Sequence, residues 1–65
     1  MNRNLVGPKE LAQYLDLSIN TVYAWVYMRK IPFFKIGRLV KFDLREIDNW
    51  TASKKVEVSK FNMED

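Results

Sequence analysis

Cysteine and histidine are both absent from this 65-residue sequence, and glycine and proline occur only twice each. Without cysteine there is no disulfide and no thiolate site, so an intracellular protein is the simpler interpretation. Without histidine, the chain also lacks the common zinc ligands, general bases and activated nucleophiles. No apolar run approaches the ~20 residues that a membrane span needs, and no signal peptide is recognisable. We expect no metal, no cofactor, no small-molecule ligand, no membrane contact and a cytoplasmic location.

Carboxylates are the remaining candidates for catalysis. The one acidic cluster worth considering consists of Asp43, Glu46 and Asp48. Asp43 and Glu46 fit a capping box at the start of a helix, and Asp48 lies a turn away on the exposed side. The sequence therefore predicts a protein that is not an enzyme.

A chain of this length forms one domain and buries only about 60% of the surface that its unfolded form exposes. We expect a folded domain over residues 1–53. Residues 54–65 have no clear hydrophobic period and end in charge, so a flexible C-terminal tail is expected there.

Charge is distributed unevenly along the chain. Between Asp16 and Asp43 there is no acidic residue, whereas the interval contains five basic ones: Arg29, Lys30, Lys35, Arg38 and Lys41. A one-sided distribution of this kind is typical of a surface that binds a polyanion. The alternative is a solvated basic face without a ligand.

Two helices are predicted in the first half of the chain, after an irregular start over residues 1–6. Gly7 and Pro8 fit the N-cap and first position of a helix that extends to residue 15. Asp16 tolerates the left-handed conformation that would end it. Ser18 is a good N-cap for a second helix over residues 19–30, which the Ile31–Pro32 step would terminate.

A hairpin and a third helix are predicted next. The runs "FFKI" (33–36) and "LVKF" (39–42) alternate with period two around Gly37–Arg38, which indicates a tight turn. "DLREIDNW" (43–50) then begins a helix, with Leu44, Ile47 and Trp50 on its apolar face. The order predicts a mainly helical α+β fold, a winged helix-turn-helix in which the hairpin is the wing.

One face of the helix over residues 19–30 is suited to DNA. Its neutral hydrogen-bonding or flat groups can meet base edges, thymine methyls and phosphates, and they are Asn20, Thr21, Tyr23, Ala24 and Tyr27. The first turn lacks an acidic residue, which leaves its N–H groups available to a phosphate. Alternatively, the two tyrosines pack beside the core or under the wing. Trp25 and Trp50 could stack on single strands, but their positions favour core roles.

Arg38 lies at the predicted hairpin tip, where its guanidinium could enter a narrow minor groove or bind a phosphate. The alternative is a charge that protects the edge strand from pairing with other chains. Gly37 is explained by turn geometry. Lys35 and Lys41 fit general phosphate-facing or solvated charges.

Three blocks of the sequence resemble one known family. "KELAQYLDLSINTVYAWV", "RKIPFFKIGRLVKF" and "DLREIDNW" are similar to the excisionase-like, MerR-type winged helix-turn-helix domains, including small AlpA-like regulators, over about residues 5–50. The resemblance implies that the helix from Ser18 to Lys30 enters the major groove and that the wing contacts backbone or minor groove. The DNA-binding residues expected are Ser18, Asn20, Thr21, Tyr23, Ala24, Tyr27, Lys30, Lys35, Gly37, Arg38 and Lys41.

The resemblance implies a nucleoid-associated excisionase that directs a mobile element's integrase, or a small phage-type transcription regulator. A protein-interaction module that docks through the tyrosine-rich face is a further alternative. The family usually has glycine at the position of Asp16 and often a basic residue at that of Ala24. The long dimerising helix of full MerR regulators is also absent. We therefore expect weak binding by a lone module, helped by an integrase or recombinase, or by further copies on the DNA.

Overall fold

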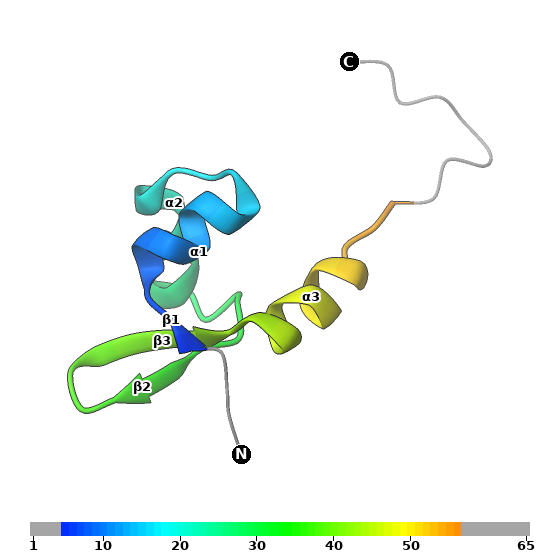
Figure 1. Ribbon diagram of the computed structural model, residues 1–65. Coiled ribbons are helices and arrows are strands. Elements are labelled where there is room, and N and C mark those ends of the chain that lie inside the picture. The colour runs from blue at the N-terminus through cyan, green and yellow to red at the C-terminus, as the bar shows by residue number, and fades with distance from the viewer. Residues whose placement is uncertain (1–4, 57–65) are drawn as a thin grey trace.

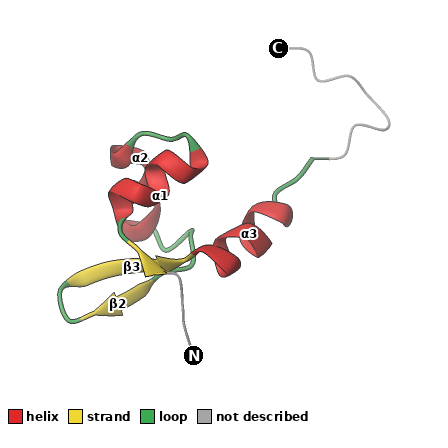
Figure 2. Cartoon of the chain, in the orientation of Figure 1, coloured by secondary structure: helices red, strands yellow, loops and turns green. Residues whose placement is uncertain are grey.

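The computed structural model describes residues 5–56, which form three helices and a three-stranded antiparallel sheet (Figure 1). The helices α1 and α2 lie on one side of the sheet, the β2–β3 hairpin extends away from them, and α3 leaves in another direction (Figure 2). The predicted α+β winged helix-turn-helix is confirmed. In chain order the elements are β1 (Leu5–Val6), α1 (Pro8–Leu15), α2 (Ile19–Tyr27), β2 (Phe34–Ile36), β3 (Leu39–Asp43) and α3 (Leu44–Ala52).

The sheet has the strand order β1-β3-β2, so the longest strand, β3, is bordered on both edges. Its hairpin with β2 follows the prediction, with Ile36 opposite Leu39 across a two-residue turn. The expectation of an irregular start was wrong for β1, which pairs with the far end of β3 through Leu5 opposite Asp43 and Val6 opposite Phe42. A strand of two residues carries too little pattern to be recognised from the sequence.

The helix starts follow their local chemistry. Gly7 precedes Pro8 at the start of α1 and donates its backbone N–H to Oε1 of Glu10 at 3.1 Å. Ser18 caps α2, and its Oγ accepts the N–H of Thr21 at 3.1 Å. Asp43 caps α3 by accepting the N–H of Arg45 at 2.9 Å. The predicted N-cap of α3 at Asp43 is thus confirmed. The second hydrogen bond of a capping box, from the N-cap N–H to the glutamate side chain, is the one that Gly7 and Glu10 form at α1.

Both α1 and α2 end in the same left-handed turn. After α1, Asp16 has φ 58°, and the N–H of Leu17 reaches back to the carbonyl of Ala12 at 2.8 Å. After α2, Arg29 has φ 57°, and the N–H of Lys30 reaches back to Trp25 at 2.8 Å. This pattern is the Schellman motif, which saturates the last carbonyls of a helix. The left-handed conformation predicted for Asp16 is confirmed. The prediction that α2 extends to residue 30 was wrong, because Arg29 turns the chain before the Ile31–Pro32 step.

The core lies between the helices and the inner face of the sheet. Phe42, Leu11, Ile47 and Val22 are fully buried, and β3, α1, α3 and α2 each contribute one of them. The apolar face predicted for α3 is confirmed, since Leu44 and Trp50 pack against this core.

Trp25 and Trp50 also pack against the core, but both are only half-buried. Their rings meet edge to face, with centroids 5.8 Å apart and an interplanar angle of 62°. The core role predicted for the two tryptophans is therefore confirmed, although both lie at the margin of the core and not inside it.

One side-chain hydrogen bond connects two helices that are distant in the sequence. The hydroxyl of Tyr14 on α1 donates to Oδ1 of Asp48 on α3 at 2.6 Å. This bond, the partial loss of water and the negative charge of Asp48 raise the pKa of Tyr14 above its ordinary value of 10.0. Asp48, which the sequence places on the exposed side of its helix, thus has a structural partner.

The domain boundary proposed after residue 53 stays a prediction. Helix α3 ends at Ala52, followed by a turn at Ser53 and Lys54. Residues 57–65 of the proposed tail, and residues 1–4 at the start of the proposed domain, lie outside the described residues.

Arg29→Gly should stabilise the domain, because glycine adopts the left-handed conformation without the steric cost that a Cβ imposes. Allowing for the added flexibility of the unfolded chain, we expect a gain of about 0.5–1 kcal/mol in the free energy of unfolding. Urea denaturation measures it. The matched control is Lys30→Gly, whose backbone φ is not positive and which should gain nothing. An Arg29→Gly variant less stable than its parent would contradict this view of the turn.

Tyr14→Phe should remove an alkaline transition in stability. Because folding raises the pKa of Tyr14, the hydrogen bond stabilises the fold fully below the unfolded pKa of about 10, and this contribution is lost as pH rises through the folded pKa. We expect the variant to be less stable at neutral pH and to lack this loss. Urea titrations across alkaline pH test it, with Tyr23→Phe as a control of nearly equal exposure (51% against 50%). Parallel pH profiles for Tyr14→Phe and the parent would refute it.

Candidate nucleic-acid interface

Helix α2 presents an uncharged polar and aromatic face to solvent. Asn20, Tyr23, Ala24 and Tyr27 are all exposed, and Tyr27 retains 87% of its accessible surface. The opposite side of the helix is held by buried Val22 and by the half-buried Trp25 and Val26, which pack against the core. The alternative in which the tyrosines pack beside the core or under the wing is therefore wrong for Tyr27, whereas Tyr23 keeps about half of its surface open, at 51%. This face is open to a partner, and it has the hydrogen-bonding and apolar groups that base edges and thymine methyls require.

Ser18 and Thr21, which the sequence assigns to the same surface, have a local role at the start of α2. The Ser18 Oγ accepts the backbone N–H of Thr21 and lies 3.0 Å from the Thr21 Oγ1. Ser18 is exposed and Thr21 half-buried. The first turn of α2 contains no acidic residue, so the positive end of the helix dipole is not neutralised from within the helix.

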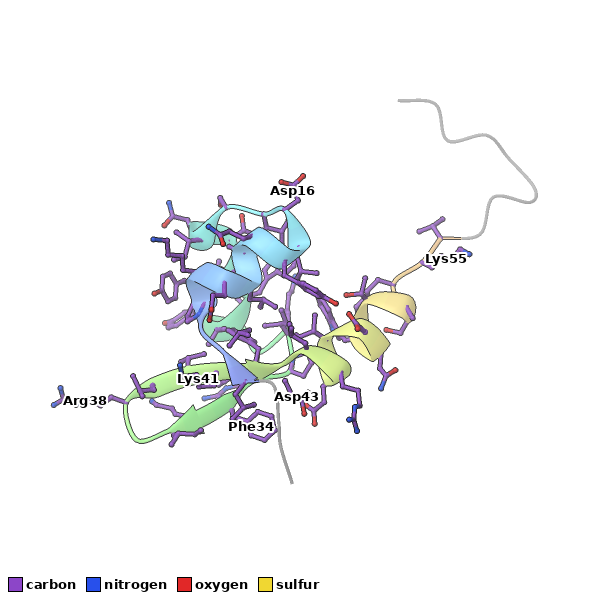
Figure 3. The ribbon with its side chains drawn as sticks, in the orientation of Figure 1. Asp16, Phe34, Arg38, Lys41, Asp43 and Lys55 are labelled. Atoms are coloured by element: carbon purple, nitrogen blue, oxygen red, sulfur yellow. The ribbon has the colours of Figure 1, made fainter. Side chains whose placement is uncertain are left out.

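The β2–β3 hairpin carries its charge at an exposed tip. Gly37 occupies the first turn position with φ 63°, a conformation that favours glycine, and apart from its two chain neighbours no described residue has an atom within 4 Å of where its Cβ would be. Arg38 follows it, is exposed, and extends away from the molecule beyond the turn (Figure 3). The turn therefore holds one guanidinium clear of the rest of the described chain.

The two lysines of the hairpin differ in position. Lys35 is exposed on β2. Lys41 is half-buried, and its Nζ lies 3.9 Å from the position of a Cβ built on Gly7, near the start of α1. Lys41 thus belongs to the base of the hairpin, where it joins the body of the domain, whereas Lys35 and Arg38 belong to its free part.

Lys30 is separated from the exposed face of α2 because the helix ends earlier than predicted. It follows the left-handed turn at Arg29 and lines an open groove of about 420 Å³ together with Trp25, Trp50 and Lys54. The Lys54 ammonium lies 5.5 Å from the centre of the Trp50 ring, within the range of a cation–π contact. Sequence reasoning missed this groove, because its walls come from two segments that are distant in the chain, α2 with the turn after it and α3 with the turn after it. A contact of Lys30 with DNA stays a prediction.

The α2 face and the hairpin tip are two separate surfaces held by a common support. Helix α1 packs against both α2 and β3, and β3 forms one strand of the hairpin.

In the described part of the chain, the side chains of Lys35, Arg38 and Lys41 form no hydrogen bond or ion pair, so these cations remain available to an external anion.

Within residues 5–56, no three acidic, histidine or cysteine side chains come together in a way that could hold a metal ion. None of the helices of that region has the length and apolar character needed to cross a bilayer.

Comparison with known families adds an independent finding. The sequence matches the model of a helix-turn-helix domain over residues 5–55, a range that includes every helix and strand described above. No significant match was found among curated proteins or among solved structures. The matched family, a helix-turn-helix domain, is broader than the excisionase-like and MerR-type families that the three sequence blocks resemble.

Proposed function

Because this chain belongs to the helix-turn-helix domain family, we propose that it is a sequence-specific double-stranded DNA-binding protein. In this proposal α2 lies in the major groove, and the β2–β3 hairpin lies against the backbone or the minor groove beside it. Helix-turn-helix domains are typically DNA-binding and not enzymatic.

The observation that carries the proposal is the combination of two surfaces within the acid-free stretch of residues 17–42. One is the open, uncharged face of α2, on which Tyr27 is 87% exposed. The other is the hairpin tip with its exposed Arg38. Neutral hydrogen-bonding groups distinguish base pairs, whereas cations bind the phosphates of any sequence. A surface that has both is suited to a specific duplex site.

We place the proposed contacts on the residues that the sequence suggested. Asn20, Tyr23, Ala24 and Tyr27 would face the bases, and Ser18 and Thr21 would orient the start of α2 toward a phosphate. Lys35, Arg38 and Lys41 would bind backbone or minor groove around the turn at Gly37, and Lys30 would reach a phosphate from beyond the end of α2.

The finer role that we propose is that of an excisionase, which shapes the DNA of a mobile element for its integrase. A small transcription regulator would use the same two surfaces. The single module described here offers few contacts, which favours a function that depends on an integrase or on further copies bound beside it. An excision assay with the integrase of the same element separates the two roles, because a transcription regulator would not change the direction of recombination.

Arg38→Ala should weaken duplex binding without unfolding the domain. A substitution at an exposed tip usually changes stability by no more than ~0.5 kcal/mol. If about four cations meet phosphates, the slope of log K against log salt should be roughly −4 for the parent and shallower by about one for the variant. Thermal melts and salt titrations measure both. A slope near zero for the parent would refute DNA binding and favour a protein-interaction module.

Asn20→Ala should reduce the preference for the cognate site more than it reduces binding to random duplex. The side chain is uncharged, so counterion release hardly changes, whereas loss of a bidentate base contact costs about 1–3 kcal/mol of discrimination. The matched control is Asn49→Ala, because Asn49 is exposed like Asn20 but lies on α3, outside the proposed interface. Competition binding against cognate and random DNA measures the ratio. Equal losses on both would assign Asn20 to the backbone or to folding.

A further inference from the structure

Two large aliphatic side chains stand exposed directly behind the hairpin tip. Ile36 and Leu39 retain 51% and 59% of their accessible surface. They are register partners immediately before and after the Gly37–Arg38 turn, and side chains of directly opposed residues lie on the same face of a sheet. They therefore form one apolar patch, which we call the wing ridge.

The wing ridge has no role in the core of the described domain. Side chains alternate along β3, and Val40 and Phe42 are the residues of this strand that pack into the core. Leu39 lies out of phase with them. Exposed aliphatic residues on a strand beside an open edge favour unwanted pairing, and proteins usually place charges there. The apolar residues at this position therefore indicate a surface that is covered in use.

The charges around the wing ridge indicate what covers it. Arg38 lies between Ile36 and Leu39 in the chain, and the next cation on their face of the hairpin is Lys41, with no acidic residue on the hairpin before Asp43. An apolar patch whose charged neighbours on the hairpin are all cations fits a partner with apolar surface next to regularly spaced anions. The deoxyribose rings that form the walls of the minor groove, between two lines of phosphates, have that combination.

The width of the hairpin restricts how it could meet a minor groove. Neighbouring strands are about 4.8 Å apart before side chains are added, whereas the minor groove of B-DNA is only about 6 Å wide. The two strands cannot enter broadside, but a single guanidinium at the tip can. The aliphatic pair behind it then stays at the rim of the groove, at the level of the sugars.

We propose that the wing ridge, Ile36 with Leu39, packs against the deoxyribose wall of the minor groove while Arg38 enters the groove or binds its phosphates. This proposal rests on the DNA-binding function proposed above and assigns a non-ionic part of the affinity to the wing. Arginine supplies the salt-dependent part, and the wing ridge supplies a part that depends on the removal of apolar surface from water.

The test is the double substitution Ile36→Thr with Leu39→Thr. Threonine keeps a strand-favouring branched side chain but removes most of the apolar surface. The control is Val56→Thr, an aliphatic residue of similar exposure (65%) beyond the end of α3. All variants are compared as the full chain on a mixed-sequence duplex long enough for one molecule, by affinity at several salt concentrations and by hydroxyl-radical cleavage, which attacks the sugars from the minor groove.

We expect the double variant to bind about tenfold more weakly, with the salt slope of the parent, and to lose protection of the sugars beside the wing. Val56→Thr should match the parent, and Arg38→Ala should instead change the slope. Unchanged affinity and protection in a folded double variant would overturn the proposal. Unchanged single-site affinity with reduced cooperativity on tandem sites would also overturn it, by assigning the wing ridge to a second copy. A parent that fails to bind any duplex would overturn the proposed function itself.

Discussion

The packing of Phe42 in the central strand is the interaction on which the rest of the fold depends. Phe42 is fully buried and lies on β3 between two neighbouring strands. Around it gather Leu11 from α1, Val22 from α2 and Ile47 from α3, all with no accessible surface. These four are the largest fully buried side chains of the described residues, and the partly buried apolar residues pack around them. The strand that carries Phe42 also forms half of the hairpin, so the core and the wing are parts of the same element.

Affinity and discrimination are assigned to different elements in the proposed interface. The face of α2 is uncharged, and the free cations lie on the hairpin and beyond the helix end. A helix without charges on its exposed face gains little from phosphates and depends on close fit to the bases. The hairpin, conversely, can hold any duplex through its charges. Under the proposed function, this division accounts for the basic turn of the hairpin, since the helix alone would have little attraction for DNA.

Local chemistry made much of this fold predictable, and long-range contacts account for what was missed. The caps at Ser18 and Asp43 and the turn at Gly37 depend on residues within three positions of each other, and all were expected. The strand β1 was not, because Leu5 and Val6 become a strand only by pairing with residues 42 and 43. The Tyr14–Asp48 hydrogen bond and the groove beside Trp50 join distant segments in the same way. The early end of α2 depends on Arg29 adopting a conformation that arginine has no intrinsic reason to favour.

For the candidate site, the exposure of the α2 face and of the hairpin tip followed from periodicity. The position of Lys30 could not be predicted, because it depends on the residue at which α2 ends.

Asp43 belongs to two elements at once, and this has a mechanical consequence. It is the last residue of β3, paired with Leu5, and also the N-cap of α3, with its carboxylate on the N–H of Arg45. No linker residue separates the strand from the helix. The backbone of Asp43 is held by its pairing with Leu5, and its side chain is held by the cap on Arg45. The direction in which α3 leaves the sheet is therefore restricted by the two contacts of a single residue.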